Sequence, residues 1–318
     1  MSYVCRVCQG SSLDHFSRRD AKNGQPLNLM LCPSCSLVQV SDLPDAVELH
    51  RYYSEAYRED YKQVHTPAAK YIARAAQAAC DRLDWIRPHW TQAQPESVDI
   101  GAGGGEFVYL SAKAGCRSRG LEPHQGYSSF AREAYDVNVQ TGGIDQLEAA
   151  SADLITLFHV LEHLLDPLHV VTQLHRALRP NGILAIEVPN ALQADASPHN
   201  IYFSAHLFYY NALSLDRLLG THFQRVWVRD RGNLCVVYRR LDAPVDLPPI
   251  NAQALQLALK TFKGRGWFTY LTEGRGWAKP LRRLQQRRFE RQFSQHTPQE
   301  ILDRVYEMRL APASTNTL

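Results

Sequence analysis

Three glycines stand at alternate positions after a short apolar run, about a third of the way along the chain: Gly101, Gly103 and Gly105. Glycine lets the backbone turn sharply and lets a ligand approach without a Cβ in the way. If a helix begins after Gly105, its first N–H groups and its partial positive charge favour a carboxylate or a phosphate. The loop therefore predicts a ligand site at a strand–helix junction, and a tight turn without a ligand is the alternative.

Glu122 ends the next apolar run, in Gly120-Leu121-Glu122-Pro123. In dinucleotide-binding folds an acidic residue near this distance from the glycine loop accepts the ribose hydroxyls, because a carboxylate can accept from two vicinal hydroxyls at once. A solvated charge at a strand end is the alternative for Glu122 alone. A dinucleotide-binding protein also fits, but the mid-chain position of the loop disfavours it.

Four of the seven cysteines form two CxxC pairs, Cys5 with Cys8 and Cys32 with Cys35. Two such pairs can supply four thiolates in tetrahedral array to Zn²⁺, and the spacing leaves room for a short β-hairpin between them. Four thiolates close the coordination sphere, so we expect a structural zinc rather than a catalytic one. Redox-active pairs and unligated thiols are the alternatives. The odd, sparse cysteine count disfavours a secreted disulfide framework.

The elements that must position these residues follow from the pattern of residues 95–240. Short β-branched runs alternate there with amphipathic segments, which is typical of a parallel α/β sheet. A turn at residues 231–233 is too short for a helical crossover, so the last two strands should form an antiparallel hairpin. We expect a doubly wound, Rossmann-like sheet of seven strands at residues 97–102, 118–121, 137–140, 153–158, 183–188, 225–228 and 234–238.

Four segments of this region, residues 98–107, 120–123, 153–167 and 178–190, resemble the successive motifs of class I S-adenosylmethionine-dependent methyltransferases. The resemblance implies that S-adenosylmethionine is the cofactor. Asp99 and the loop would hold its methionine part, Glu122 its ribose, and Asp145 would lie near its adenine. Phe158 and His159 would close over it from the end of the fourth strand. The loop positions are Gly101, Ala102, Gly103 and Gly105.

Histidines follow the fourth and fifth expected strands. For methyl transfer to a hydroxyl a base must remove the proton, and histidine suits that task near neutral pH. His159 stands directly at a strand end, and His206 lies in the aromatic segment of residues 198–211. His163 is more readily explained as packing at a strand–helix junction. We therefore expect His206 or His159 to be the catalytic base.

The segment of residues 198–211 is also similar to the Tyr-His-Glu-His-Leu region of bacterial deoxysugar C-methyltransferases, which carry an N-terminal zinc-binding domain. His206 matches the second histidine, but Phe203, Ser204 and Ala205 replace the other three residues. The loss of the carboxylate and the phenol disfavours C-methylation. We therefore expect O-methylation of a sugar or another small or glycan-linked acceptor, as in polysaccharide biosynthesis. His199, Tyr202 and Tyr209 are expected to contact the acceptor, although packing of a lid explains the aromatics equally well.

Residues 263–291 carry nine Lys or Arg against two Glu, interleaved with aromatics. Such mixtures suit an anionic membrane surface or a lipid-linked carrier, and less so RNA; a solvated charged helix is the alternative. The chain has a net charge of +3 and no membrane-spanning apolar run, so we expect a cytoplasmic protein, peripheral at the inner face of the membrane. The sequence leaves the oligomeric state open.

Four regions result: a zinc-binding module at 1–45, a helical connector at 46–94, a cofactor domain at 95–240 and a basic helical extension at 241–318. Two other functions remain open. An RNA or protein methyltransferase could use the zinc module and the basic tail for recognition. A non-catalytic zinc-dependent binding protein could carry a degenerate methyltransferase fold, but the intact glycines and Glu122 disfavour it.

Overall fold

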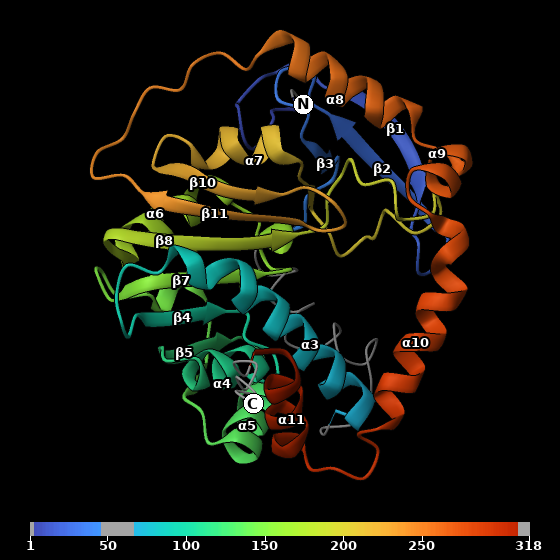
Figure 1. The fold of residues 1–318 in the computed structure, drawn as a ribbon. Coiled ribbons are helices and arrows are strands. Elements are labelled where there is room, and N and C mark those ends of the chain that lie inside the picture. Colours follow the sequence, from blue (N-terminus) through green and yellow to red (C-terminus); the bar gives the residue numbers. More distant parts are fainter. Residues whose placement is uncertain (1–2, 46–66, 311–318) are drawn as a thin grey trace, which may run out of the picture. The chain divides into compact units, whose positions relative to one another are not determined.

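The computed structural model describes residues 3–45 and 67–310 (Figure 1). The chain divides into two compact units, one of residues 1–49 and 157–279 and the other of residues 50–156 and 280–318. The part of the expected helical connector at residues 46–66 lies outside the described residues. Among the residues that the structure describes, no helix has the length and apolarity needed to cross a membrane.

Seven strands form one sheet in the order β10-β11-β8-β7-β4-β5-β6. β4, β5 and β6 pair in parallel, whereas β8, β11 and β10 pair antiparallel. The expected mixed sheet with an antiparallel hairpin at its end is therefore confirmed. The strands are β4 (Glu96–Ile100), β5 (Arg117–Glu122), β6 (Val139–Thr141), β7 (Ala152–Phe158), β8 (Leu178–Val188), β10 (Phe223–Arg229) and β11 (Leu234–Arg240).

One strand begins earlier than the sequence pattern predicts. β8 starts at Leu178 rather than Ile183, directly where helix α6 (Pro167–Ala177) ends. Pro180 disfavours the helical conformation of the residue before it, so the chain leaves the helix and extends at once. The apolar run at residues 183–188 is only the buried part of this longer strand.

The unit of residues 50–156 and 280–318 contains β4, β5 and β6 with the helices around them. α11 packs against α3 and also contacts α4, and these three lie together in Figure 1. The Tyr109 hydroxyl of α4 donates a 2.8 Å hydrogen bond to Asp303 of α11, so the last helix is part of this unit. Its helices are α3 (Ala69–Ile86), η2 (Arg87–His89), α4 (Glu106–Lys113), α5 (Gln125–Tyr135), η3 (Ile144–Gln146), α10 (Lys279–Arg291) and α11 (Pro298–Leu310).

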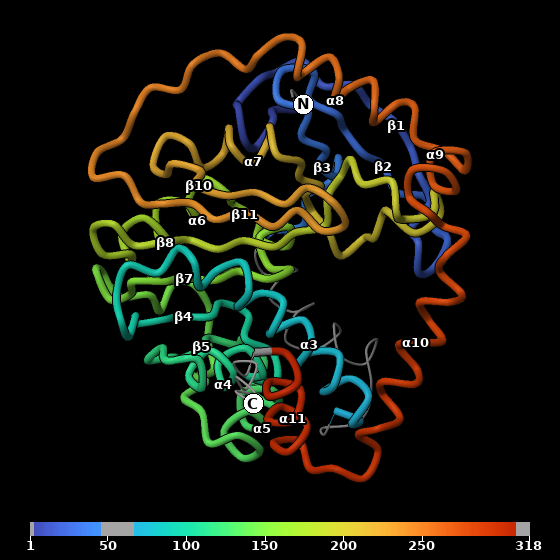
Figure 2. The backbone as a smooth tube through the Cα atoms, in the orientation of Figure 1, coloured from blue at the N-terminus to red at the C-terminus, as the bar shows by residue number. Residues whose placement is uncertain are grey.

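The unit of residues 1–49 and 157–279 contains a second, antiparallel sheet of β1 (Asp14–Arg19), β2 (Pro26–Leu31), β3 (Val38–Val40) and β9 (Phe208–Tyr209). β9 lies within the aromatic segment of residues 198–211, and Figure 2 shows that segment beside the N-terminal strands. The Asn211 side chain donates a 2.9 Å hydrogen bond to the Ser36 carbonyl. The cysteine-bearing segment is thus built into this unit. Its remaining helices are η4 (Leu161–His163), α6, α7 (Ala212–Leu219), α8 (Ala252–Gly264), α9 (Trp267–Thr272) and η5 (Gly276–Ala278).

Candidate cofactor, acceptor and metal sites

The glycine loop leads from β4 into α4 with three residues in the left-handed region, at φ values of 70° for Gly101, 55° for Gly103 and 84° for Gly105. A Cβ on Gly105 would stand 2.7 Å from the Cβ of Ala131 in α5, whereas a Cβ on Gly103 would meet nothing within 4 Å. Gly105 is therefore needed for packing. Gly103 instead presents open backbone beside the N-terminus of α4, which is where a ligand is expected.

Glu122 is tied to this loop through the main chain. Its Oε2 accepts a 2.9 Å hydrogen bond from the Gly103 N–H, and its Oε1 accepts a 3.0 Å bond from the His124 N–H. The side chain is only 8% exposed. The structure thus brings together the glycine loop and the acidic residue that the sequence pattern pairs. The two backbone N–H groups hold the Glu122 carboxylate in one position, and its remaining lone pairs can accept hydrogen bonds from a diol.

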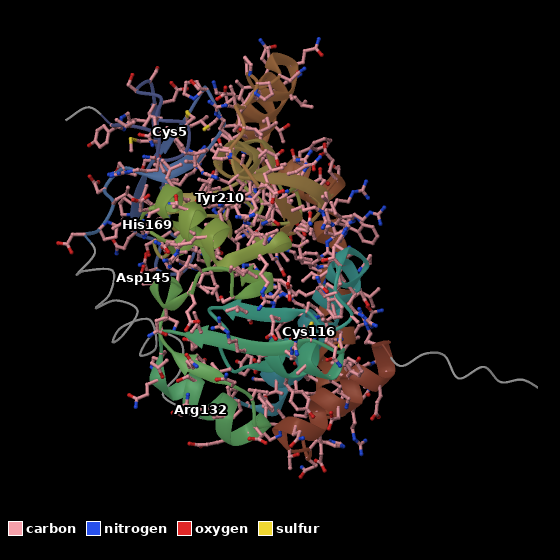
Figure 3. All side chains as sticks on the ribbon, turned by 90° about the vertical axis from the view of Figure 1, so that its left-hand side faces the viewer. Cys5, Cys116, Arg132, Asp145, His169 and Tyr210 are labelled. Carbon is pink, nitrogen blue, oxygen red and sulfur yellow. The ribbon has the colours of Figure 1, made fainter. Side chains whose placement is uncertain are left out.

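Asp99, the last polar residue of β4, is buried beside the same loop. The Thr156 hydroxyl donates a 2.6 Å hydrogen bond to its Oδ1, and burial raises the pKa of Asp99 to about 7. Sequence analysis did not single out Thr156; a polar residue inside the apolar run of β7 was the available signal. Ala102 is buried next to Asp99, while Asp145, marked in Figure 3, is exposed on η3.

His159 follows β7 directly after the buried Phe158 and has a φ of 57°, an unusual conformation for a residue other than glycine. Its Nδ1 lies 3.5 Å from Glu162 and its Nε2 lies 3.3 Å from Glu187. Burial opposes protonation, but the two carboxylates outweigh it and raise the pKa of His159 to about 9. The imidazole is therefore protonated on both ring nitrogens, and so positively charged, near neutral pH. The Asn233 amide donates a 2.6 Å hydrogen bond to Glu187 and completes this group.

His206 and His163 face one another, with ring centroids 4.9 Å apart at an angle of 79°. Burial lowers the pKa of His206 to about 4, so its imidazole is neutral near neutral pH. Glu162 stands against both rings and is 1% exposed. The sequence pattern favoured a packing role for His163 and missed Glu162, although a charged residue between Leu161 and His163 at a strand–helix junction was the available signal.

The residues expected to contact an acceptor separate into two groups. His199 and Tyr202 line a cavity of about 600 Å³, whose lining also includes Arg18 and Arg19 of β1. Tyr209 is 3% exposed, and its hydroxyl accepts a 3.0 Å hydrogen bond from the Phe203 N–H and donates a 2.8 Å bond to the Phe203 carbonyl. Tyr209 therefore stabilises its own segment, and the packing alternative describes it better.

The two CxxC pairs converge on one point beside the N-terminal sheet, where Figure 3 marks Cys5. The Sγ atoms of Cys5 and Cys35 lie 3.6 Å apart, and those of Cys8 and Cys32 lie 3.5 Å apart. All four sulfurs lie within 4.8 Å of one another. Zn–S bonds of about 2.3 Å in a tetrahedron require sulfur separations of about 3.8 Å, so the four thiols fit a zinc ion. The expected hairpin between the pairs is confirmed as β1 and β2.

Comparisons with known proteins show which family the chain resembles. A model of the methyltransferase domain family matches residues 63–222. A protein of Mycolicibacterium smegmatis, named as a probable S-adenosylmethionine-dependent methyltransferase, is 30% identical over 39% of this chain and 49% of its own length. The ubiquinone biosynthesis O-methyltransferase of Methylococcus capsulatus is 28% identical over 34% of this chain and 49% of its own length. The chain spans about half the length of the curated relatives it matches.

The solved structures that match the chain have low sequence identity and TM-scores below 0.5. One match is magnesium protoporphyrin IX methyltransferase of Synechocystis with bound S-adenosylmethionine. The match spans 63% of this chain and 99% of the Synechocystis chain, with 15% sequence identity and a TM-score of 0.45. An S-adenosylmethionine-dependent methyltransferase of Mesorhizobium loti covers 49% and 96%, with 17% identity and a TM-score of 0.42. Because the family model matches half of the chain, the protein belongs to the methyltransferase domain family.

Proposed function

We propose that the chain transfers a methyl group from S-adenosylmethionine to a hydroxyl oxygen of a sugar or another small or glycan-linked acceptor. The observation that carries this proposal is the hydrogen bond between the Gly103 N–H and Glu122, within a chain of the methyltransferase domain family. Several relatives are named as ubiquinone biosynthesis O-methyltransferases, which supports oxygen as the accepting atom.

The residues around the glycine loop fit the cofactor. When bound, S-adenosylmethionine supplies the electrophilic methyl group. The open backbone at Gly103 and the N-terminus of α4 suit its carboxylate, and Glu122 would hold the ribose hydroxyls. Asp99 is held by Thr156 and supports the loop from β4. The protein's own contribution is to bind and orient the reacting group.

The lining of one cavity supports an acceptor that carries an anionic group besides its hydroxyl. The cavity beside β1 is lined by Arg18, Arg19, His199 and Tyr202, which suit a phosphate and a sugar ring.

The acceptor hydroxyl must also lose its proton, and we assign that step to the histidines around Glu162. Of the two expected bases, His206 has a neutral imidazole that can accept a proton. His159 is already the positively charged imidazolium and cannot accept one.

We further propose that Cys5, Cys8, Cys32 and Cys35 bind one structural Zn²⁺. Three of these side chains are buried, and the module contains only short strands around them. A segment of this size stabilises its fold largely through the metal. The pairing of β3 with β9 then connects the cysteine-bearing module to the aromatic segment of residues 198–211, which contains His206 and Tyr209.

The basic tail supports a weaker proposal, a contact with an anionic lipid surface. On α9 and η5 the large apolar side chains of Phe268 and Trp277 are 81% and 71% exposed. On α10 Leu281 and Leu284 are exposed among exposed arginines. Arg265 differs from the other basic residues of the tail. It is half-buried and donates a hydrogen bond to the Ala191 carbonyl, so it stabilises the fold and is not counted in the lipid contact. Flotation of the full chain on anionic vesicles, with a Phe268→Ser/Trp277→Ser variant that should float less, tests this contact.

A methyl-transfer screen with labelled S-adenosylmethionine tests the proposed function. Sugar nucleotides, glycolipids, free glycans and RNA serve as acceptors. Label in a sugar-bearing acceptor, lost in His206→Ala while cofactor binding is retained, supports the proposal. Label only in RNA favours a macromolecular methyltransferase. Normal turnover in both His206→Ala and His159→Ala would exclude the two histidines, and absence of cofactor binding would favour a zinc-dependent binding protein.

A further inference from the structure

Glu162, His163 and His206 form a compact group of side chains in the unit of residues 1–49 and 157–279. One carboxylate oxygen and one nitrogen of each ring all lie within 4.8 Å of one another. Glu162 and His163 come from η4, and His206 comes from the segment before β9. The Leu207 N–H donates a 2.9 Å hydrogen bond to the Glu162 carbonyl, so the backbone holds the two segments together.

The carboxylate at the centre of this group lacks hydrogen bonds. Glu162 is 1% exposed, and neither of its oxygens has a hydrogen-bond partner among residues 3–45 and 67–310. The nearest ring nitrogens are Nδ1 of His159 at 3.5 Å and Nε2 of His163 at 3.9 Å from Oε1 of Glu162, which is at or beyond the limit of a hydrogen bond. A buried charge without hydrogen bonds is costly, so a cation closer to the carboxylate than the His159 imidazolium would stabilise it further.

The His163 ring is oriented as metal-binding imidazoles usually are. Nδ1 of His163 lies 2.8 Å from the Ala205 carbonyl, which accepts the Nδ1 proton in the neutral ring and turns Nε2 towards Glu162. Metal-binding histidines commonly donate their other ring N–H to a backbone carbonyl in this way. On His206, Nδ1 is buried and has no hydrogen-bond partner in the described part of the chain. One nitrogen of each ring and one Glu162 oxygen thus lie within 4.8 Å of one another, an arrangement that a bound cation would stabilise.

We propose that Glu162, His163 and His206 bind a divalent transition-metal ion through one carboxylate oxygen and two imidazole nitrogens. This ligand set suits ions such as Zn²⁺, Co²⁺, Mn²⁺ or Fe²⁺. The site is separate from the four cysteines. Three protein ligands leave coordination positions open, whereas four thiolates close the sphere.

The consequence for catalysis rests on the proposed function. A metal ion held by these residues would lower the pKa of an acceptor hydroxyl at an open position, so that solvent water could take the proton. His206 would then act on the acceptor as a ligand of the ion and not as a free base. Metal binding itself does not depend on this step, so the two can be tested apart.

Co²⁺ is the probe that distinguishes the two sites. The full chain is first loaded with one equivalent of Zn²⁺ to fill the cysteine site and is then titrated with Co²⁺ under visible and near-ultraviolet spectroscopy. We expect one further equivalent of Co²⁺ with weak visible bands and no thiolate charge-transfer band. Glu162→Gln and His206→Ala should each weaken this binding at least about tenfold. His175→Ala is the matched control, because His175 and His222 also lie 4.9 Å apart but are not among the candidate metal-binding groups of the described residues.

Thermal denaturation and cofactor binding guard against misfolded variants. Co²⁺ should raise the Tm of the zinc-loaded wild type but not that of Glu162→Gln, and both should bind S-adenosylmethionine equally. Absence of a second equivalent, a thiolate band on the added Co²⁺, or undiminished binding by Glu162→Gln and His206→Ala would overturn the metal site. Such a result with cofactor binding intact would leave the proposed methyl transfer in place.

Discussion

The N–H of Gly103 donates a 2.9 Å hydrogen bond to Oε2 of Glu122, which joins the loop after β4 to the end of β5. The two residues occupy the carboxyl ends of neighbouring parallel strands, where open α/β sheets bind their ligands. The bond holds the carboxylate in place before any ligand arrives.

Replacement of Glu122 by Gln should weaken S-adenosylmethionine binding by about 10- to 100-fold, because charge-assisted hydrogen bonds contribute about 1.5–3 kcal/mol. Isothermal titration calorimetry measures the change. Glu133→Gln, at an exposed position on α5, is the matched control and should bind as the wild type does. Equal affinities for the two variants would show that Glu122 does not contact the cofactor.

Substitution of the two loop glycines, Gly103 and Gly105, by alanine should affect different properties of the protein. Gly105→Ala should lower the free energy of unfolding by about 2 to 4 kcal/mol, because the new Cβ combines a left-handed conformation with a contact to Ala131. Gly103→Ala should cost only about 1 kcal/mol of stability, but its methyl group should reduce cofactor affinity. Denaturant unfolding and calorimetry on both variants separate the effects. The same loss of stability in both would contradict this division.

Asp99 should make the stability of the protein fall as pH rises. Burial raises its folded-state pKa to about 7, whereas an unfolded Asp has a pKa of about 3.9. Between these values the folded state holds a proton that the unfolded state has released, so the stabilisation is present at low pH and is lost as pH rises through 7.

Asp99→Asn removes this titration and keeps an acceptor for Thr156. From pH 5 to pH 7.5 its free energy of unfolding should rise relative to the wild type by roughly 2 to 3 kcal/mol. Chemical denaturation at both pH values gives the difference. Asp136→Asn, at the exposed C-terminus of α5, is the control and should follow the wild type. A parallel course of Asp99→Asn and wild type would refute the assignment.

The sheet was largely predictable, since alternating apolar runs and turn residues are local signals. The hairpin of β10 and β11 followed from the length of one turn, and the clustering of Cys5, Cys8, Cys32 and Cys35 followed from their spacing. The pairing of β3 with β9 was not predictable, because it joins Val38 to Tyr209 and no local pattern encodes that contact.

The site was predictable to the extent that its residues follow strand ends. Glu122 and the glycines could be paired from their positions. The role of Glu162 could not, because its surroundings include His206, which is distant in the sequence. His159 illustrates the same limit, since its high pKa depends on Glu187 of β8 as well as on its neighbour Glu162.

The cysteine site should contain one zinc ion per chain after purification, and Cys8→Ser should lose it. Elemental analysis after dialysis against a mild chelator measures the content. Cys116→Ser alters a cysteine outside the cluster and should keep the metal. Loss of zinc should also lower the Tm, since the metal stabilises the module that pairs with β9. Metal-free protein with unchanged stability would contradict the structural role.

The central claim is that this chain binds S-adenosylmethionine at the loop joined to Glu122. Calorimetry of the full chain with S-adenosylmethionine, followed by the Gly103→Ala and Glu122→Gln variants, tests it most directly. We predict one site per chain in the wild type, with affinity reduced in both variants while their folds persist. Absence of binding to the folded wild type, or equal affinity in all three proteins, would contradict the account.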